Sequence, residues 1–170
     1  MSKAIFITSK DLKRYSVLDG NIDEGKFMPY IEQAQDIHIQ SYLGTDLYDK
    51  IMSLILSNTI NDASNAVYKT LLTTYIKPML IQWSLVQFLP FVAYTIANGG
   101  VYKHSSESSE TVNKEEVDYL QAQARTTANY YTDRLVRFLC DRSIDYPEYN
   151  TNTGSDISPQ GETDFLSWVI

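Results

Sequence analysis

Apolar residues recur at every third or fourth position along most of this chain, which is the spacing of an α-helix that buries one face. We expect Asp23 to open one such helix and Leu43–Gly44 to end it. A second helix is expected to begin at Thr45 or Asp46 and to reach Ile55. The inward positions of these two helices are predicted to be Phe27, Tyr30, Ile31, Ala34, Ile37, Tyr42, Leu47, Ile51, Leu54 and Ile55.

Two further helices are predicted before and after this pair. A brief one over residues 11–15 is expected to have Ser9 as its N-cap. The last helix has the clearest pattern, and Asn113 with Glu116 resembles a capping arrangement at its start. Its apolar stripe is predicted to be Val117, Leu120, Ala124, Ala128, Tyr131, Leu135 and Phe138. We expect Pro147 to end all helix.

The central segment is more apolar than any other. Helical signals resume near Ala66, and from Ile76 to Ala97 the chain reads "IKPMLIQWSLVQFLPFVAYTIA", without a charged residue after Lys77. Its length is close to the ~20 residues that span a membrane. Glutamine, serine and two prolines interrupt it, however, and amphipathic helices elsewhere need an apolar surface to cover. We therefore expect a buried core or subunit-interface helix, with a membrane span as the alternative.

A short arm is expected after this segment, over residues 99–111. A Gly-Gly pair breaks the helix, "VYKHS" is able to form a strand, and a Ser/Glu run follows as a turn or tip. Unpaired strand edges favour pairing with a neighbouring chain, so this arm is a candidate interface. The candidate residues are Gly99, Gly100, Val101, Tyr102, Lys103 and His104.

The C-terminal part is expected to differ from the helical domain of residues 1–146. From 147 onwards the chain is polar and acidic, as in a flexible linker, and it finishes on the apolar cluster Phe165, Leu166, Trp168, Val169 and Ile170. This cluster either folds back onto its own core or docks onto another molecule, with Trp168 as anchor. We favour the second, with Lys10, Lys13 and Arg14 of another chain as partners for the acids.

Composition and charge reduce the number of function classes that fit this chain. The 170 residues fit a single domain. The net charge is −7; residues 141–170 carry six acids and one base, which is −5, and the remainder carries −2. No basic surface for gripping phosphates is apparent, so tight nucleic-acid binding is not expected. The start of the chain lacks the apolar core of a signal peptide, and we expect a cytosolic product.

Residues that carry chemistry are few. Cys140 is the single cysteine, which excludes an intramolecular disulfide, and its run "LVRFLC" favours a buried, inert thiol. His38 and His104 lie in different segments without metal-ligand spacing. We find no phosphate-binding loop, dinucleotide fingerprint or nucleophile elbow. We therefore expect no catalytic residue, no cofactor and no metal, and hence no enzyme.

Three segments together resemble the head–tail adaptor (connector or ring) proteins of tailed bacteriophages, most closely those of crAss-like phages. They are "FITSKDLKRYSVLDGNID", "YIEQAQDIHIQSYLGTDLYDKI", and "NGGVYKHSSE" leading into "RLVRFLCDRSIDYPEYN". The most specific parts are the helix–glycine–helix joint "YLGTDLY" and the "YPEY" after the last helix. The resemblance covers about residues 5–150.

The resemblance implies an all-α bundle of four or five helices with a short β-hairpin. It also implies a ring, typically of twelve copies, in the virion at the portal vertex, assembled in the bacterial cytoplasm. Such a ring binds the portal protein and a tail or second ring protein, and it extends the channel through which DNA passes without specific binding. The acidic composition suits a wall along which DNA slides. The alternatives are a soluble helical-bundle regulatory or binding protein and a single-span membrane protein.

Overall fold

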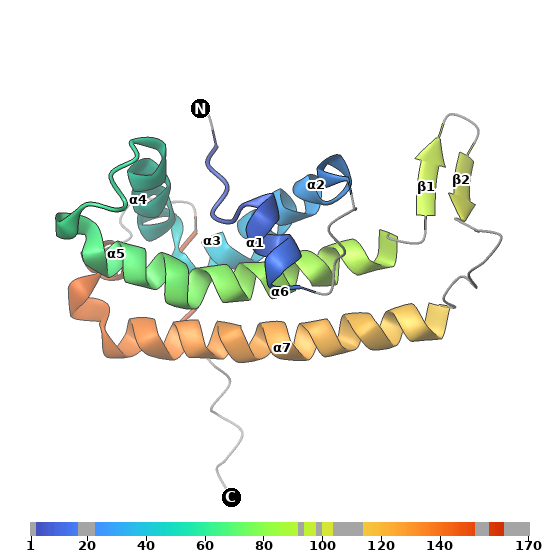
Figure 1. Ribbon diagram of the computed structural model, residues 1–170. Coiled ribbons are helices and arrows are strands. Elements are labelled where there is room, and N and C mark those ends of the chain that lie inside the picture. Colours follow the sequence, from blue (N-terminus) through green and yellow to red (C-terminus); the bar gives the residue numbers. More distant parts are fainter. Residues whose placement is uncertain are drawn as a thin grey trace, which may run out of the picture.

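The computed structural model describes residues 3–16, 23–91, 94–97, 100–103, 114–151 and 157–161. It is mostly helical, as the sequence predicted (Figure 1). Helix α7 (Lys114–Asp141) lies along α6 (Lys77–Phe88), and α2 (Glu24–Ala34) and η1 (Gln35–Ile39) from the first third of the chain also pack on α6. Helix α6 is therefore the centre of the core, which explains why it is the most apolar segment.

Helix α1 (Ser9–Arg14) is fixed at its start by a reciprocal capping box. The Asp11 amide donates to the Thr8 hydroxyl at 3.1 Å, and the Thr8 amide donates to the Asp11 carboxylate at 3.0 Å. The N-cap is thus Thr8 and not Ser9, because only Thr8 stands three residues before an acid that reaches back.

Helices α2 (Glu24–Ala34) and α3 (Gln40–Leu43) are joined without a break by η1 (Gln35–Ile39), a segment of π-helix. Asp23 caps α2, as predicted. The wider π turn changes which residues face the core. Gln35 is fully buried, whereas Ile37, which the α-helical spacing places inward, is 47% exposed.

The buried Gln35 fastens the N-terminal segment to this helix. Its side-chain oxygen accepts from the Phe6 amide at 2.8 Å, and its nitrogen donates to the Ala4 carbonyl at 3.0 Å. The same nitrogen donates to the Tyr48 hydroxyl at 2.9 Å. These bonds satisfy backbone groups that burial would otherwise leave unpaired.

Gly44 ends α3 and begins α4 (Thr45–Leu56), as the sequence predicted. Its φ of 74° and ψ of 163° belong to a region that is essentially restricted to glycine. Of the inward positions predicted on α4, three are buried and Ile55 is partly buried.

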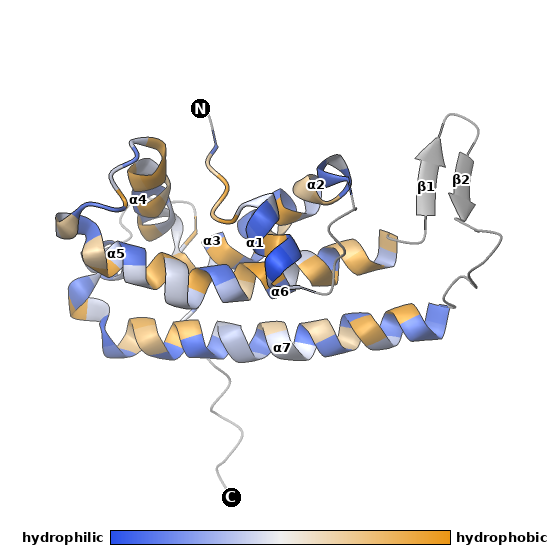
Figure 2. Cartoon of the chain, viewed as in Figure 1, coloured by the Kyte–Doolittle hydropathy of each residue, from blue (hydrophilic) through white to orange (hydrophobic). Residues whose placement is uncertain are grey.

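The central helical run comprises η2 (Ala63–Asn65), α5 (Ala66–Thr70), the π segment η3 (Leu71–Ile76), α6, and η4 (Leu89–Phe91). Most of α6 is apolar, whereas α7 alternates apolar with polar residues (Figure 2). No helix in the described ranges is long and apolar enough to cross a membrane.

The prediction that helix continues to Ala97 is wrong. Strand β1 (Tyr94–Ala97) follows η4 and pairs antiparallel with β2 (Gly100–Lys103), so that Tyr94 faces Lys103. Pro90 gives a physical reason for the early end, because it has no N–H to donate to the Val86 carbonyl. That carbonyl accepts from the Gln121 side chain of α7 instead, at 2.9 Å.

Helix α7 is buried along only part of its predicted stripe. Its buried residues are Ala128, Thr132, Leu135, Val136 and Leu139. Nearer its start, Leu120 is 49% exposed and Tyr119 is 64% exposed. The proposed cap Asn113 lies outside the described residues. The first half of α7 therefore presents apolar and aromatic side chains to the surface.

The prediction that Pro147 ends all helix is also wrong. After η5 (Ser143–Asp145), Pro147 is the first residue of α8 (Pro147–Thr151), where its missing N–H costs nothing. Glu148 of α8 accepts the Tyr68 hydroxyl at 2.9 and 3.0 Å. Burial and this carboxylate raise the pKa of Tyr68 to about 12. Helix α8 is thus tied to α5 by the hydrogen bonds between Glu148 and Tyr68.

Candidate functional site

A groove of about 520 Å³ lies between α1, the junction of η3 with α6, and α7. We call it the α1 groove. Its lining residues are Asp11, Tyr15, Thr73, Lys77, Pro78, Ile81, Gln82 and Tyr131. Pockets of this size accommodate a few side chains of a ligand or partner.

An ion pair fixes one wall of the α1 groove. Lys77 Nζ lies 3.1 Å from the Asp11 carboxylate, which also accepts from the Thr8 amide. Burial alone would raise the pKa of Asp11, but the Thr8 hydrogen bonds and Lys77 together hold it below its usual value. The capping motif is local, although the sequence prediction placed the cap at Ser9 and not at Thr8, whereas nothing in the sequence indicates a pairing across 66 positions.

A second cluster lies where η1, α6 and α7 meet. The His38 ring stacks on Trp83 with centroids 3.6 Å apart, and Gln87 Nε2 lies 3.4 Å from His38 Nε2. Trp83 Nε1 donates to the Thr132 hydroxyl at 3.0 Å. Burial, helped by the charge of Arg125, lowers the pKa of His38 to about 4. His38 is therefore a neutral packing residue at pH 7.

This arrangement predicts how stability depends on pH. The unfolded chain binds a proton at His38 near pH 6.5, and the folded chain binds it only near pH 4, so stability falls as the pH drops through this window. Replacing His38 with Phe keeps a ring on Trp83 and removes the titration. Between pH 6.5 and 5 we expect the wild type to lose about 1 kcal/mol more than His38→Phe, measured by urea unfolding; this is less than the full linkage value because solvent screens the partly exposed ring. Parallel pH profiles would contradict the prediction.

Residues 157–161 form a strap across the α3–α4 joint. The Thr45 amide donates to the Ile157 carbonyl at 3.0 Å, and the Gln160 amide donates to the Ser41 carbonyl at 3.0 Å. The Ile157 amide donates to the Thr45 hydroxyl at 3.3 Å. Residues 157–161 of the predicted flexible linker are therefore held by backbone groups that the helix ends leave unpaired.

Cys140 is exposed, contrary to the prediction of a buried thiol. The run "LVRFLC" is longer than one helical turn, so its residues cannot all face inward. Leu135 and Leu139 occupy the inward side, and Cys140 is turned away from it. Among the described residues, no group of three or more histidine, cysteine or acidic side chains is placed to hold a metal ion.

The interface residues predicted from the sequence are only partly described. Gly100, Val101, Tyr102 and Lys103 form β2, opposite β1. Gly99, His104 and the cluster Phe165, Leu166, Trp168, Val169 and Ile170 lie outside the described residues. The structure adds two surfaces that the sequence did not reveal, which are the α1 groove and the exposed first half of α7.

A family model described as a family of unknown function (DUF6712) matches residues 39–159, from the end of η1 into the strap. No curated protein matches. No solved structure matches either.

Proposed function

We propose that this chain, which belongs to the DUF6712 family, is a structural subunit of a ring that joins the portal vertex of a tailed-phage capsid to the tail. The resemblance of its three segments to head–tail adaptor proteins supports this role. In the proposal a homo-oligomer, most simply of twelve copies, binds the portal protein on one side and a tail or second ring protein on the other.

One structural observation gives the strongest support to the proposal. A closed ring needs a heterologous interface, in which two different patches of each subunit meet. The chain has two candidate patches, namely the α1 groove with Tyr15 at 59% exposure, and the exposed face of α7 with Tyr119 and Tyr130 at 64% each; Tyr131 of α7 also lines the groove. Exposed tyrosines are enriched where proteins meet.

The charge distribution agrees with a channel component. DNA that moves through a ring must not adhere to it, and a wall of negative charge repels phosphates. This chain carries −7 in total, and −5 of it lies in residues 141–170. The ring would therefore extend the DNA channel for ejection without binding DNA specifically.

The test is assembly in the virion. Phage that lack this chain are expected to accumulate heads without tails, and purified wild-type virions are expected to contain the chain in mass spectra. Complementation with a variant in which a short Gly-Ser link replaces residues 101–109 is expected to restore no tailed particles. Strand β2 begins at Gly100, and its edge is the proposed contact to a neighbour.

A control separates assembly from folding. The residue-101–109 variant should keep the helical circular dichroism of the wild type, because the described residues of that range, 101–103, belong to strand β2. Normal tailed particles without the chain would rule out the proposed function and favour a soluble binding or regulatory protein. Tailed particles with the variant alone would remove the arm from the interface.

A further inference from the structure

We propose that the α1 groove of one copy binds residues 162–170 of a second copy. This inference rests on the proposed function and deepens it, since it names a contact between adjacent subunits of the proposed ring. The occupant sequence is "ETDFLSWVI", two acids followed by an apolar run.

The chemistry of the α1 groove suits this segment. Ile81 at 4% exposure forms part of its wall beside Pro78 and the partly buried Tyr131. Tyr15 of α1 stands at the groove and remains 59% exposed. An aromatic ring that is open to solvent beside an apolar wall is the kind of site where a tryptophan anchor gains most on burial.

Charge complementarity favours the same occupant. Lys10 and Arg14 are exposed on α1, next to the groove residues Asp11 and Tyr15. Asp11 itself is paired with Lys77, so its charge is compensated. Glu162 and Asp164 precede the apolar run and would lie along the exposed cations of α1.

Arg134 extends this positive surface along α7. It lies one helical turn beyond the groove residue Tyr131, and its guanidinium sits 4.9 Å from the centre of the Tyr75 ring. Burial, helped by the charge of the neighbouring acid Asp133, raises the pKa of Tyr42 on α3.

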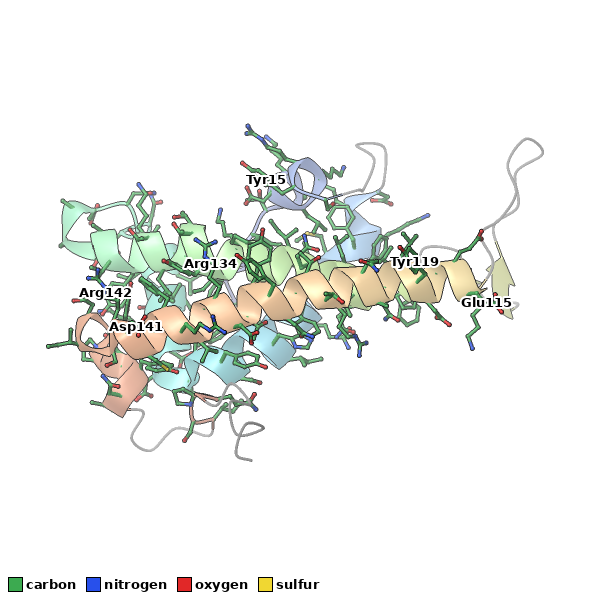
Figure 3. The ribbon with its side chains drawn as sticks, turned by 90° about the horizontal axis from the view of Figure 1, so that it is seen from below. Tyr15, Glu115, Tyr119, Arg134, Asp141 and Arg142 are labelled. Atoms are coloured by element: carbon green, nitrogen blue, oxygen red, sulfur yellow. The ribbon has the colours of Figure 1, made fainter. Side chains whose placement is uncertain are left out.

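The strap indicates that the occupant comes from a second copy. The hydrogen bonds to Ser41 and Thr45 fix residues 157–160 at the α3–α4 joint. Figure 3 shows α1, marked by Tyr15, on one side of α7 and the cyan α3 on the other. Nine residues reach about 30 Å when fully extended. The segment starts from the side of α7 opposite to its own α1 groove, which favours the groove of a neighbouring copy.

The experiment uses the full chain with the photo-crosslinker benzoylphenylalanine in place of Trp168. Isotopically light and heavy protein are mixed, irradiated and digested, and linked peptides are identified by mass. We expect links from position 168 to the peptides that carry Tyr15, residues 77–82 or Tyr131. Mixed light–heavy pairs are expected about as often as like pairs, which is the result of random exchange between copies.

A charge-reversed variant tests the groove independently of folding. Lys10→Glu with Arg14→Glu is expected to reduce these links roughly three- to tenfold at low salt and less at high salt. Lys69→Glu, an exposed cation on α5, is the matched control and should leave them unchanged.

Each other outcome overturns the inference. Links found only within one chain would show that the segment docks on its own subunit. Links to other surfaces, or none, would remove the α1 groove as the acceptor. The failure of the proposed function is separable, because that function is tested in virions. If copies cross-link through the groove but are absent from virions, the proposed ring at the portal is wrong and the contact through the groove still stands.

Discussion

Replacing Trp83 with alanine is expected to lower the free energy of unfolding by about 3–5 kcal/mol, the usual cost of removing a buried tryptophan. Trp83 is 9% exposed and touches two partners from distant parts of the chain. It stacks on His38 at 3.6 Å and donates to Thr132 at 3.0 Å. Its removal opens a cavity in the middle of α6 and leaves a buried threonine hydroxyl with one bond fewer.

Urea unfolding followed by circular dichroism measures this loss. Tyr119→Ala is the matched control, because Tyr119 is also aromatic and helical but is 64% exposed, and its change should stay within about 0.5 kcal/mol. Trp83→Phe should fall between the two, since it keeps a ring beside His38 and loses the bond to Thr132. Equal losses for Trp83→Ala and Tyr119→Ala would show that α7 and α6 do not pack as described.

Replacing Gln35 with methionine is expected to cost roughly 2–4 kcal/mol, although the two side chains have similar size. Methionine fills the space but offers no partner to the Phe6 amide, the Ala4 carbonyl or the Tyr48 hydroxyl. Each of these groups bonds to Gln35 at 2.8–3.0 Å in a buried setting. Leaving buried polar groups unpaired is the source of the loss.

Amide hydrogen exchange adds a local measurement to the unfolding free energy. The Phe6 amide is expected to lose its protection in Gln35→Met before the rest of the fold does, because that amide donates to the replaced side chain. Gln33→Met is the control, since Gln33 lies two positions away on the same helix and is exposed. Unchanged protection of the Phe6 amide would show that Gln35 does not hold the N-terminal segment in place.

The candidate site was only partly readable from the sequence. The capping relation between Thr8 and Asp11 is a local motif, and the arm and the apolar C-terminal cluster stand out by composition. The α1 groove does not, because its walls come from α1, α6 and α7, and the pairing of Asp11 with Lys77 spans 66 positions. Single-sequence patterns carry no information on which exposed polar residues of distant helices meet.

The sequence by itself determined the helical class and the helix boundaries at Asp23 and Gly44, because capping and chain reversal depend on neighbouring residues. Asp23 begins α2, and Gly44 joins α3 to α4 in a backbone conformation that glycine alone adopts readily. Tertiary structure decided the rest. The π segment turns Gln35 into the core and Ile37 out of it, and Gln121 of α7 takes the carbonyl that Pro90 leaves unpaired. The burial of Gln35 and the hydrogen bond from Gln121 depend on residues more than twenty positions away in the sequence. Packing against those residues outweighs the local helical spacing.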